Sequence, residues 1–350
     1  MPLKKILTAL SGGVDSAVAA ALLRERGFTV GGATMLLRPG GEGEAGDAAA
    51  AARRLGLPFH CFRWAAAFDE AVIAPFAAAY RAGDTPNPCV FCNRAMKFGR
   101  FLDEALALGY DGVATGHYAR VERDAASGRY VLKTARDAAK DQSYMLAVLT
   151  QAQLARTVLP LGELTKAEVR ALAAAFGLAE QQGKKDSQDI CFVPDGDYLA
   201  FLERWGLTPQ PGRFRDASGA DLGPHRGYEA YTIGQRRGLG LSGPARQYVL
   251  AKPRPDVVVG GPEGLYTDRV TVAEMNWIPW EAPPAAFPAR ARLRYSARPA
   301  PCTVRPADGG AVLTFDDPQR AVTPGQTAVL YDGELVLGAG RIVKSDKSGR

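Results

Sequence analysis

The sequence has few cysteines, no long apolar run and no internal repeat. Its five cysteines are an odd number in a chain of 350 residues, which does not suggest the disulfide framework of a secreted protein. No apolar stretch approaches the roughly 20 residues that span a bilayer, and the first residues have the pattern of a strand rather than a signal peptide. We therefore expect a cytoplasmic protein without a membrane segment, whose thiols are reactive or bind a metal.

The composition is ordinary for a folded chain, but the charge is unevenly placed. Hydrophobic residues make up 47% and charged residues 23%, and the length predicts two or three domains. Residues 201–350 carry 20 Lys and Arg against 15 Asp and Glu, although the net charge of the whole chain is only +6. Arginine dominates this excess, and its planar fork suits phosphates. A basic C-terminal region favours a polyanionic substrate, with an ordinary arginine-rich surface as the alternative.

One stretch, Ser11-Gly12-Gly13-Val14-Asp15-Ser16, separates an apolar strand pattern at 3–10 from a helix pattern at 17–26. A Gly-Gly pair lets the backbone approach a ligand, and the first amides of the helix face that ligand without intrahelical partners. Such a turn binds an anion, most often a phosphate. It is neither a Walker loop nor GxGxxG. An ordinary tight turn is the alternative, but Asp15 and Ser16 argue against it, since a carboxylate beside a phosphate is tolerable mainly with a divalent cation.

Strand and helix patterns alternate after this stretch. We expect a strand at 29–37, a glycine-rich loop at 38–46, a helix at 48–55, a strand at 58–62 and a helix at 68–82. This order predicts an α/β, doubly wound parallel sheet that binds ligands at the carboxyl ends of its strands. A further strand at 111–114 would bring Gly116 to that edge, where His117 either contacts substrate or is an interior histidine.

The cysteines form the second notable pattern. Two prolines stiffen residues 85–89, and a helix pattern from Asn93 onward would put Cys92 at the helix N-cap, where the dipole lowers a thiol pKa. A small buried cysteine is the alternative. Cys191 lies in a short apolar run, usually a sign of packing, but with Cys89 and Cys92 it makes either a sulfur-transfer set or three metal ligands. Cys61 and Cys302 have no partner pattern and are interpreted as structural.

The later segments change from helical to β-type patterns. Lys140-Asp141-Gln142-Ser143 opens a helix-like run, with Lys140 able to reach a phosphate. From about residue 208, short β-type runs occur at 231–233, 248–250 and 257–259, and others at 291–295, 311–315, 327–331 and 334–337 suggest a small barrel. We predict a catalytic domain over 1–205, a small β-rich central domain over 206–270 and a C-terminal β-barrel over 271–350.

Seven segments, taken together and in order, resemble the tRNA-specific 2-thiouridylases, which are PP-loop enzymes. They are SGGVDSAVAA, TPNPCVFCNRAMKFG, ATGHYAR, KDQSYML, KKDSQDICFVPDGDY, HRGYEAYTIGQRRGLGL and RYSARP. The resemblance covers nearly the whole chain. It implies an ATP-dependent tRNA-uridine 2-sulfurtransferase that thiolates the wobble uridine, position 34, with Mg²⁺ as the counter-ion of ATP and with the barrel in contact with tRNA.

The resemblance also implies roles for individual residues. Those expected to bind ATP are Ala9, Leu10, Ser11, Gly12, Gly13, Val14, Asp15, Ser16, Met35 and Gly116. Those expected to face the target base are Asn87, Pro88 and Cys89. Those expected to contact tRNA are His117, Lys140, Asp141, Gln142, Arg294, Tyr295 and Gln326. Cys191 matches the cysteine that carries a persulfide, and Cys92 matches its partner nucleophile.

The implied chemistry explains these residue types. The C2 oxygen of uracil is a poor leaving group, so ATP adenylates it, and the Cys191 persulfide then brings sulfur to C2. Cys92 attacks that persulfide to release sulfide, or resolves the enzyme as a Cys92–Cys191 disulfide. The implied partners are tRNAs for Lys, Glu and Gln, and a cysteine desulfurase or sulfur-relay protein.

Cys89 departs from the family pattern, because many members have aspartate there. Cys89, Cys92 and Cys191 could instead hold a [4Fe–4S] cluster with one iron open to sulfide, whereas zinc lacks a fourth ligand. The persulfide route is preferred because the rest of the chain follows the family that uses it. A PP-loop synthetase acting on a small acceptor would explain the Ser-Gly-Gly stretch but not the cysteines. A non-enzymatic RNA-binding module would leave Asp15, Cys92 and Cys191 without a purpose.

Overall fold

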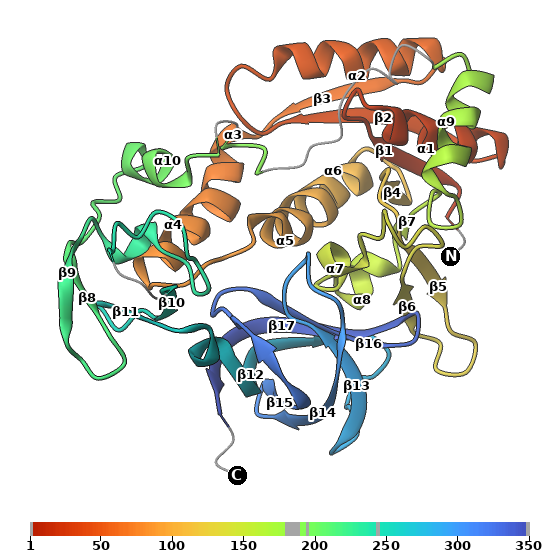
Figure 1. The fold of residues 1–350 in the computed structure, drawn as a ribbon. Coiled ribbons are helices and arrows are strands. Elements are labelled where there is room, and N and C mark those ends of the chain that lie inside the picture. Colours follow the sequence, from red (N-terminus) through yellow and green to blue (C-terminus); the bar gives the residue numbers. More distant parts are fainter. Residues whose placement is uncertain (1–2, 179–189, 194–195, 243–245, 348–350) are drawn as a thin grey trace.

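The computed structural model describes residues 3–178, 190–193, 196–242 and 246–347. Its first unit is a parallel sheet of five strands in the order β3-β2-β1-β4-β7 (Figure 1). The predicted doubly wound α/β sheet is therefore confirmed. The strands are β1 (Lys5–Ala9), β2 (Thr29–Leu36), β3 (Phe59–Arg63), β4 (Gly112–Ala114) and β7 (Thr157–Val158).

The sheet is buried on both faces, as expected for parallel strands whose crossover connections are helices. Neighbouring residues of β1 point to opposite faces, so Ile6 packs in one core and Leu7 in the other. The core around Ile6 contains helices α1 (Val14–Glu25), α2 (Glu42–Arg54) and α9 (Lys166–Ala175). The glycine-rich loop predicted at 38–46 is wrong in its second half, because α2 already begins at Glu42.

The core around Leu7 contains two longer helical rods, each with a π-helical segment. One rod joins α3 (Ala65–Phe68), η1 (Asp69–Ile73) and α4 (Ala74–Arg81), and the other joins α5 (Pro88–Cys92), η2 (Asn93–Arg100) and α6 (Phe101–Ala107). The second rod begins at Pro88, with Asn87 as its N-cap, rather than at Asn93 as predicted. Cys89, expected to face the target base, and the catalytic candidate Cys92 therefore both lie inside its first five residues.

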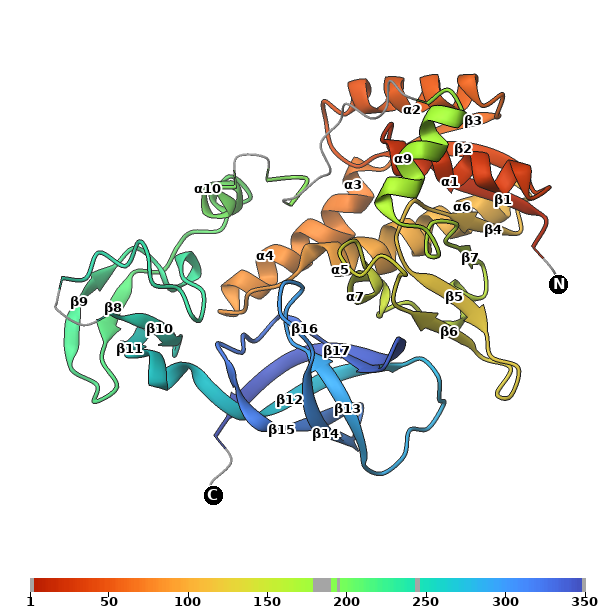
Figure 2. The ribbon, with the colours of Figure 1, turned by 45° about the vertical axis from the view of Figure 1, so that its right-hand side comes forward.

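Two β units follow. The smaller, named the central unit here, contains the sheet β10-β11-β8-β9. Its strands are β8 (Gly212–Arg215), β9 (Asp221–His225), β10 (Tyr248–Ala251) and β11 (Val257–Gly260). Helix α10 (Tyr198–Arg204) precedes it in the chain (Figure 2). The strand predicted at 231–233 is absent, because those residues follow the short 3₁₀-helix η4 (Tyr228–Ala230) as irregular chain.

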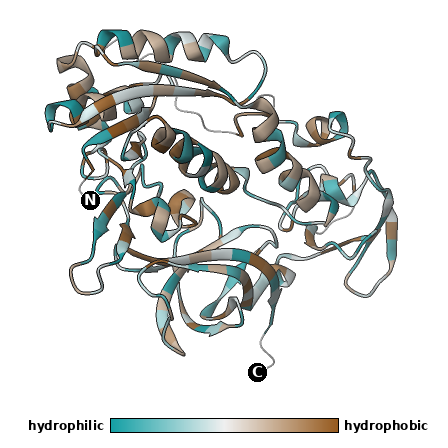
Figure 3. Ribbon diagram, turned by 180° about the vertical axis from the view of Figure 1, so that it is seen from behind, coloured by the Kyte–Doolittle hydropathy of each residue, from teal (hydrophilic) through white to brown (hydrophobic). Residues whose placement is uncertain are grey.

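The larger β unit is a closed barrel in the order β12-β15-β14-β13-β16-β17, because β12 also pairs with β17. Its strands are β12 (Tyr266–Trp277), β13 (Phe287–Arg292), β14 (Ala300–Ala307), β15 (Gly310–Arg320), β16 (Thr327–Asp332) and β17 (Leu335–Asp346). The strand predicted at 291–295 ends at Arg292. Hydrophobic and hydrophilic segments alternate along the barrel strands (Figure 3), as expected where one face covers a core.

The barrel is joined to the first unit through a hairpin that the sequence did not reveal. Strands β5 (Arg120–Arg123) and β6 (Tyr130–Lys133) extend the barrel sheet, because Leu132 and Lys133 pair with Val336 and Leu335 of β17. Helix α7 (Ser143–Leu146) adds a second connection, since the Tyr144 hydroxyl donates to the carbonyl of Thr327 at 2.7 Å. Helix α8 (Gln151–Leu154) follows α7. No described helix is long and apolar enough to cross a membrane.

Candidate functional site

The Ser-Gly-Gly stretch forms a self-braced turn between β1 and α1. The Ser16 hydroxyl donates to the Gly13 carbonyl at 3.0 Å and accepts from the Ser11 amide at 3.1 Å. Gly12 has φ +74°, and a Cβ there would lie 2.6 Å from the Cβ of Asp47 on α2, so only glycine fits. Val14 begins α1, whose first amides have no intrahelical acceptor. The turn therefore presents backbone donors at the carboxyl end of β1.

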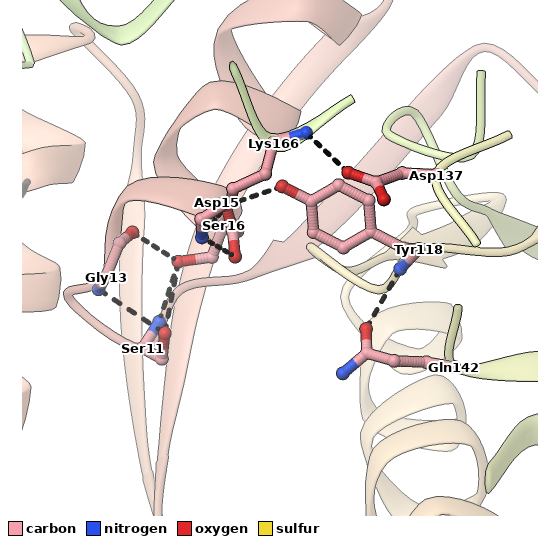
Figure 4. A network of polar contacts seen from close by, with 8 residues as sticks. All are labelled: Ser11, Gly13, Asp15, Ser16, Tyr118, Asp137, Gln142 and Lys166. Atoms are coloured by element: carbon pink, nitrogen blue, oxygen red, sulfur yellow. Dashed lines mark hydrogen bonds and ion pairs between the residues drawn. The ribbon is translucent and has the colours of Figure 1, made fainter. Parts of the chain in front are cut away.

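The Asp15 carboxylate is held by two other elements (Figure 4). Lys166, the first residue of α9, places its Nζ 2.8 Å from both carboxylate oxygens. The Tyr118 hydroxyl donates to Oδ1 at 2.9 Å. The prediction treated Asp15 as a reason for a divalent cation, but in this structure its oxygens are taken up by a lysine and a tyrosine.

The other residues expected to bind ATP lie along the same edge of the sheet. Ala9 ends β1, and the Leu10 amide donates to the Ala33 carbonyl at 2.7 Å. Met35 lies near the end of β2. Gly116 follows β4 and crosses the start of α1 so closely that a Cβ would lie 2.8 Å from the Asp15 carbonyl carbon and the Ser16 nitrogen. The backbone at Gly116 therefore packs directly against the Ser11–Ser16 turn at the carboxyl edge of the sheet.

The first turn of α5 carries the residues expected to face the base. Asn87 caps the helix, because its side-chain oxygen accepts from the Cys89 amide at 3.1 Å. Pro88 occupies the first helical position, where a missing N–H costs nothing. The rod is tied to α7 by Asn93, whose amide donates to the Met145 carbonyl at 3.0 Å. The segments containing Cys89 and the Lys140–Ser143 motif are thus directly connected.

Cys191 reaches this region from a distant part of the chain. The Arg38 guanidinium donates to the Cys191 carbonyl at 2.6 Å and to Glu44 Oε1 at 2.6 Å. The next residue, Phe192, is buried against Phe68 and Phe76, with ring centroids 5.6 and 5.4 Å away. An apolar anchor and an arginine thus hold Cys191, while Cys191 itself is exposed. The Lys184–Asp189 part of its motif lies outside the described residues.

The three cysteines influence one another electrostatically. Burial raises the pKa of Cys92 to about 11, with smaller increases from Cys191 and Cys89 and an opposing effect of the Lys97 ammonium. Although Cys89 and Cys191 keep an exposed surface, partial desolvation by the surrounding protein also raises the pKa of their thiols, and the Lys97 ammonium again acts in the opposite direction. The prediction of a low thiol pKa at Cys92 is therefore wrong: Asn87 caps the helix, and Cys92 is buried within it. All five cysteines are free.

Three of the residues expected to contact tRNA, Lys140, Asp141 and Gln142, form hydrogen bonds within the protein. Asp141 accepts from the Ser143 hydroxyl at 2.8 Å and the Ala135 amide at 3.0 Å, and Gln142 Oε1 accepts from the Tyr118 amide at 2.9 Å. The Lys140 amide donates to the Asp137 carbonyl. These hydrogen bonds stabilise the loop before α7.

His117 is partly buried in this structure. Its Nδ1 lies 2.7 Å from the Thr115 hydroxyl, and its ring lies 5.8 Å from that of Phe98. Burial, assisted by the positive charge of Lys97, holds its pKa well below the usual value. His117 is therefore neutral at physiological pH. The sequence leaves open whether it contacts substrate or is an interior histidine.

The barrel residues expected to contact tRNA occupy different environments. Arg294 donates to the Ile233 carbonyl at 3.1 Å, to the Ala321 carbonyl at 2.6 Å and to the Thr323 hydroxyl, so it joins the barrel to the central unit. Tyr295 is exposed, and the Arg292 guanidinium lies 5.1 Å from its ring centroid. Gln326 donates to the Thr85 carbonyl at 2.7 Å. Tyr295 is thus the exposed member of these three, while Arg294 and Gln326 are half-buried.

The described side chains offer no ready metal site. Within residues 3–178, 190–193, 196–242 and 246–347, no three His, Cys, Asp or Glu side chains are grouped so that they could hold a metal ion. That finding concerns a single metal ion, and a [4Fe–4S] cluster on Cys89, Cys92 and Cys191, whose ligands lie on different irons and farther apart, stays a prediction. The only acid in the turn, Asp15, is paired with Lys166.

The fold and the edge of the sheet define a PP-loop, or HUP-type, nucleotide-binding domain followed by two β units. Family profiles agree with this division: "tRNA methyl transferase HUP domain" matches residues 4–195, "tRNA methyl transferase PRC-barrel domain" matches 200–260 and "Aminomethyltransferase beta-barrel domain" matches 267–342. The tRNA-specific 2-thiouridylase MnmA of Syntrophotalea carbinolica is 48% identical, over 97% of this chain and 98% of the relative. The chain belongs to the tRNA-specific 2-thiouridylase family.

Two further comparisons give the range of similarity. The tRNA-specific 2-thiouridylase MnmA of Magnetococcus marinus is 46% identical, over 97% of this chain and 99% of the relative. A solved 4-thiouridine synthetase–RNA complex with bound ATP is 18% identical with a TM-score of 0.39, over 57% of this chain and 50% of that chain. The family relationship thus extends over the full length, while the likeness to that solved structure is partial.

Sequence reasoning missed three residues of the site. Lys97 lies within the second quoted segment, and one turn of the π-helix η2 brings it near the cysteines. Lys166 follows Thr165 in a Thr-x-x-Glu capping box, a signal for a helix start. Tyr118 lies next to His117 in the third segment. No local signal links Lys166 to Asp15, which lies 151 residues earlier.

Proposed function

We propose that this chain is a tRNA-uridine 2-sulfurtransferase that converts the wobble uridine at position 34 of tRNA to 2-thiouridine, using ATP. One observation carries the proposal: nearly 97% of the chain aligns with tRNA-specific 2-thiouridylases at 46–48% identity. The Lys97 ammonium lowers the pKa of Cys89, Cys92 and Cys191 alike, which favours their thiolates and supports the sulfur-transfer step.

In this proposal the turn Ser11–Ser16, with Ala9 and Leu10 before it, binds the phosphates of ATP. Met35 and Gly116 flank the adenine and ribose, because they lie at the carboxyl ends of β2 and β4, the two strands on either side of β1. Backbone amides supply the donors to the phosphates. Mg²⁺ enters with ATP as the counter-ion of its phosphates, since Asp15 is bonded to Lys166 and Tyr118.

The target uridine then binds at the start of α5, beside Asn87, Pro88 and Cys89. Its C2 oxygen attacks the α-phosphorus of ATP, forming an O–P bond and releasing pyrophosphate. The adenylated oxygen becomes a good leaving group. The remaining contacts to tRNA are assigned to His117, Lys140, Asp141, Gln142, Arg294, Tyr295 and Gln326, and Gln326 also positions the chain before α5 through its bond to the Thr85 carbonyl.

Sulfur is carried by Cys191 as a persulfide. Its terminal sulfur attacks C2, and AMP leaves with the bonding electron pair of the C2–O bond. Cys92 then attacks the Cys191 sulfur, so that the S–S bond to the base breaks, 2-thiouridine leaves and a Cys92–Cys191 disulfide forms. A thiol reductant supplies the two electrons that restore both thiols. Alternatively Cys92 attacks the persulfide first, and the hydrosulfide released attacks C2.

The Cys92 step needs a proton acceptor or a change in environment. A thiol with a pKa of about 11 is almost fully protonated at neutral pH. Lys97 lowers that pKa, and we assign to it the stabilisation of the thiolate. The wobble-uridine tRNAs for Lys, Glu and Gln are the proposed substrates, and a cysteine desulfurase or a sulfur-relay protein loads Cys191, in the reducing cytoplasm.

The test is mass spectrometry of nucleosides from tRNA incubated with enzyme, ATP, cysteine and a cysteine desulfurase. Wild type should form 2-thiouridine, and Cys191→Ser should form none. Cys61→Ser, an exposed cysteine on strand β3, is the matched control and should remain active. Formation of 2-thiouridine by Cys191→Ser would remove the persulfide assignment. Adenylation of a small acceptor without tRNA would favour a synthetase.

A second measurement separates the two sulfur routes. Anaerobically purified enzyme should contain no stoichiometric iron or sulfide, and Cys89→Asp should keep its activity, because the persulfide route does not use the Cys89 sulfur. A stoichiometric cluster that is lost together with activity in Cys89→Asp would instead establish a cluster mechanism.

A further inference from the structure

Three separate parts of the chain meet at the Asp15 carboxylate, and the thiolation chemistry alone does not explain why. Asp15 lies in the first turn of α1, Tyr118 follows β4, and Lys166 begins α9. The Lys166 ammonium contacts both carboxylate oxygens at 2.8 Å. The lysine side chain is only 10% exposed and that of Asp15 25%. This is a partly buried, bidentate ion pair directly beside the phosphate-binding turn.

The lysine is held rigidly in this position. Thr165 caps α9 with its side chain, and Glu168 returns the bond to the Thr165 amide, a complete capping box. The Lys166 amide donates to Asp137 Oδ2 at 2.9 Å. The Lys166 ammonium also lies 6.0 Å from the centroid of the Tyr118 ring, within the range of a cation–π contact. Fixed backbone and aromatic contacts therefore aim Lys166 at Asp15.

Charge explains why such a pair is useful here. An unpaired carboxylate in the first turn of α1 would repel the phosphates of an incoming nucleotide, and this repulsion is strongest where solvent is partly excluded. It would also oppose the attraction of the helix N-terminus for anions. A lysine bonded to both oxygens cancels the negative charge of Asp15. The backbone amides of the turn then dominate the electrostatic potential that the phosphates meet.

We propose that Lys166 is a positioning residue whose role is to neutralise Asp15, so that the Ser11–Ser16 turn accepts the phosphates of ATP. The inference rests on the proposed function only for the identity of the nucleotide. It differs from a metal-ligand role for Asp15. A metal ligand must keep its negative charge for the nucleotide to bind. If Lys166 only neutralises Asp15, the charges of both residues can be removed together and ATP still binds.

A double-mutant cycle separates these roles. The full chain is prepared as wild type, Lys166→Met, Asp15→Asn and Asp15→Asn/Lys166→Met, with Lys344→Met, an exposed barrel lysine, as the matched control. Binding of Mg-ATP is measured by calorimetry without tRNA at two ionic strengths, and KM for ATP and kcat are measured in the thiolation assay. Circular dichroism and the midpoint of thermal unfolding establish that each variant is folded.

Lys166→Met should weaken ATP binding by about tenfold, because it exposes the phosphates to an unpaired carboxylate. The loss should appear in Kd and in KM for ATP, with kcat nearly unchanged, and it should shrink at high ionic strength. Asp15→Asn should bind ATP at least as well as wild type. The double variant should return to within about threefold of wild type, because charge balance is restored.

Three results would overturn the proposal. Unchanged ATP binding in Lys166→Met would show that Asp15 does not repel the nucleotide. A double variant as weak as Lys166→Met would mean that the lysine itself contacts ATP. Loss of Mg-ATP binding in Asp15→Asn would make Asp15 a metal ligand. Wild type that binds ATP but never forms 2-thiouridine would refute the proposed function, while the binding cycle would still decide the role of Lys166.

Discussion

The side-chain amide of Gln326 donates to the backbone carbonyl of Thr85 at 2.7 Å, joining the barrel to the segment that leads into α5. The Thr85 amide donates in turn to the Pro324 carbonyl at 3.0 Å. Gly325 is packed so tightly that a Cβ would lie 2.8 Å from the Thr85 nitrogen. On the side of the central unit, the Tyr228 hydroxyl donates to the Arg81 carbonyl at 2.6 Å. Both β units therefore fix the chain just before Asn87 and Cys89.

Gln326→Ala should reduce the rate of thiolation without changing ATP affinity. The substitution removes one bond that positions the entry to α5, a loss of about 1 kcal/mol, or about fivefold in rate if the bond is kept in the transition state. Initial rates of 2-thiouridine formation and ATP titrations measure the two effects. Gln319→Ala is the control, because the Gln319 side chain donates to the Asp317 carbonyl in its own strand, β15.

A fall in tRNA affinity alone, with kcat intact, would contradict the positioning role of Gln326 and leave it as a simple contact to the substrate. The two explanations are separable because a contact to tRNA is lost in KM, whereas a misplaced α5 reduces the rate of the bound complex.

Gly116→Ala should weaken ATP binding, because its new Cβ would lie 2.8 Å from backbone atoms of Asp15 and Ser16. Backbone cannot rotate away as a flexible side chain can, so the turn would shift, at a cost of about 1–3 kcal/mol. Gly46→Ala in α2 is the matched control, since nothing lies within 4 Å of its Cβ position. Helix propensity should make that control slightly more stable.

ATP titration and thermal unfolding of both glycine variants provide the measurement. Equal ATP affinities for Gly116→Ala and wild type would mean that the close approach at Gly116 has no bearing on the nucleotide site.

The features that the sequence predicted correctly are those set by local pattern. The Ser11–Ser16 turn, the parallel strands and the barrel strands all follow from turn residues and from two-residue or helical periodicity. The start of α5 was misplaced although Asn87-Pro88 is itself a start signal, an N-cap followed by proline at the first position. The two prolines by themselves predict extended chain up to Cys89, which places the helix start too late.

Contacts between distant residues could not be predicted in the same way. Asp15 and Lys166 meet only because α9 packs on α1, and Cys191 lies beside the rod of α3, η1 and α4 only because Phe192 is buried among Phe68 and Phe76. The pairing of β6 with β17 joins residues about two hundred positions apart. Such neighbours depend on the complete tertiary structure, which no local periodicity encodes. The pKa of Cys92 follows the same rule, because burial determines it.

Cys92 should react slowly with iodoacetamide at neutral pH and much faster at high pH. With a pKa of about 11, only about one thiol in a thousand is ionised at pH 8. The rate should rise about tenfold per pH unit up to pH 10, because the thiolate is the reactive form. Mass spectrometry of peptides from enzyme labelled without tRNA distinguishes Cys92 from the exposed Cys89 and Cys191.

Lys97→Met should slow Cys92 labelling further at each pH, because the ammonium favours the thiolate. Arg94→Met, an exposed cation on the same π-helical segment, is the control. A labelling rate for Cys92 that is already maximal at pH 7 would contradict the raised pKa and restore the low-pKa thiolate inferred from sequence.

Lys252, a half-buried lysine of the central unit, lies within electrostatic range of Asp84. Its Nζ donates to the Tyr231 carbonyl at 2.8 Å. Burial lowers its pKa to about 8, although Asp84 and Glu229 act in the opposite direction. Because the folded pKa lies below the value of 10.5 for an unperturbed lysine, the unfolded chain binds the proton more tightly, and raising the pH above about 8 stabilises the fold.

Wild type should therefore gain about 1–2 kcal/mol of unfolding free energy, relative to Lys252→Met, between pH 7.5 and 9.5. Below pH 7.5 the lysine is protonated in both states, so the difference between the two proteins should stop changing with pH. Urea unfolding at matched pH values measures it, and taking the difference between the proteins cancels the titration of tyrosines and cysteines common to both. Parallel pH profiles for wild type and Lys252→Met would mean that Lys252 has the same pKa in the folded and the unfolded chain, and that burial does not penalise its charge.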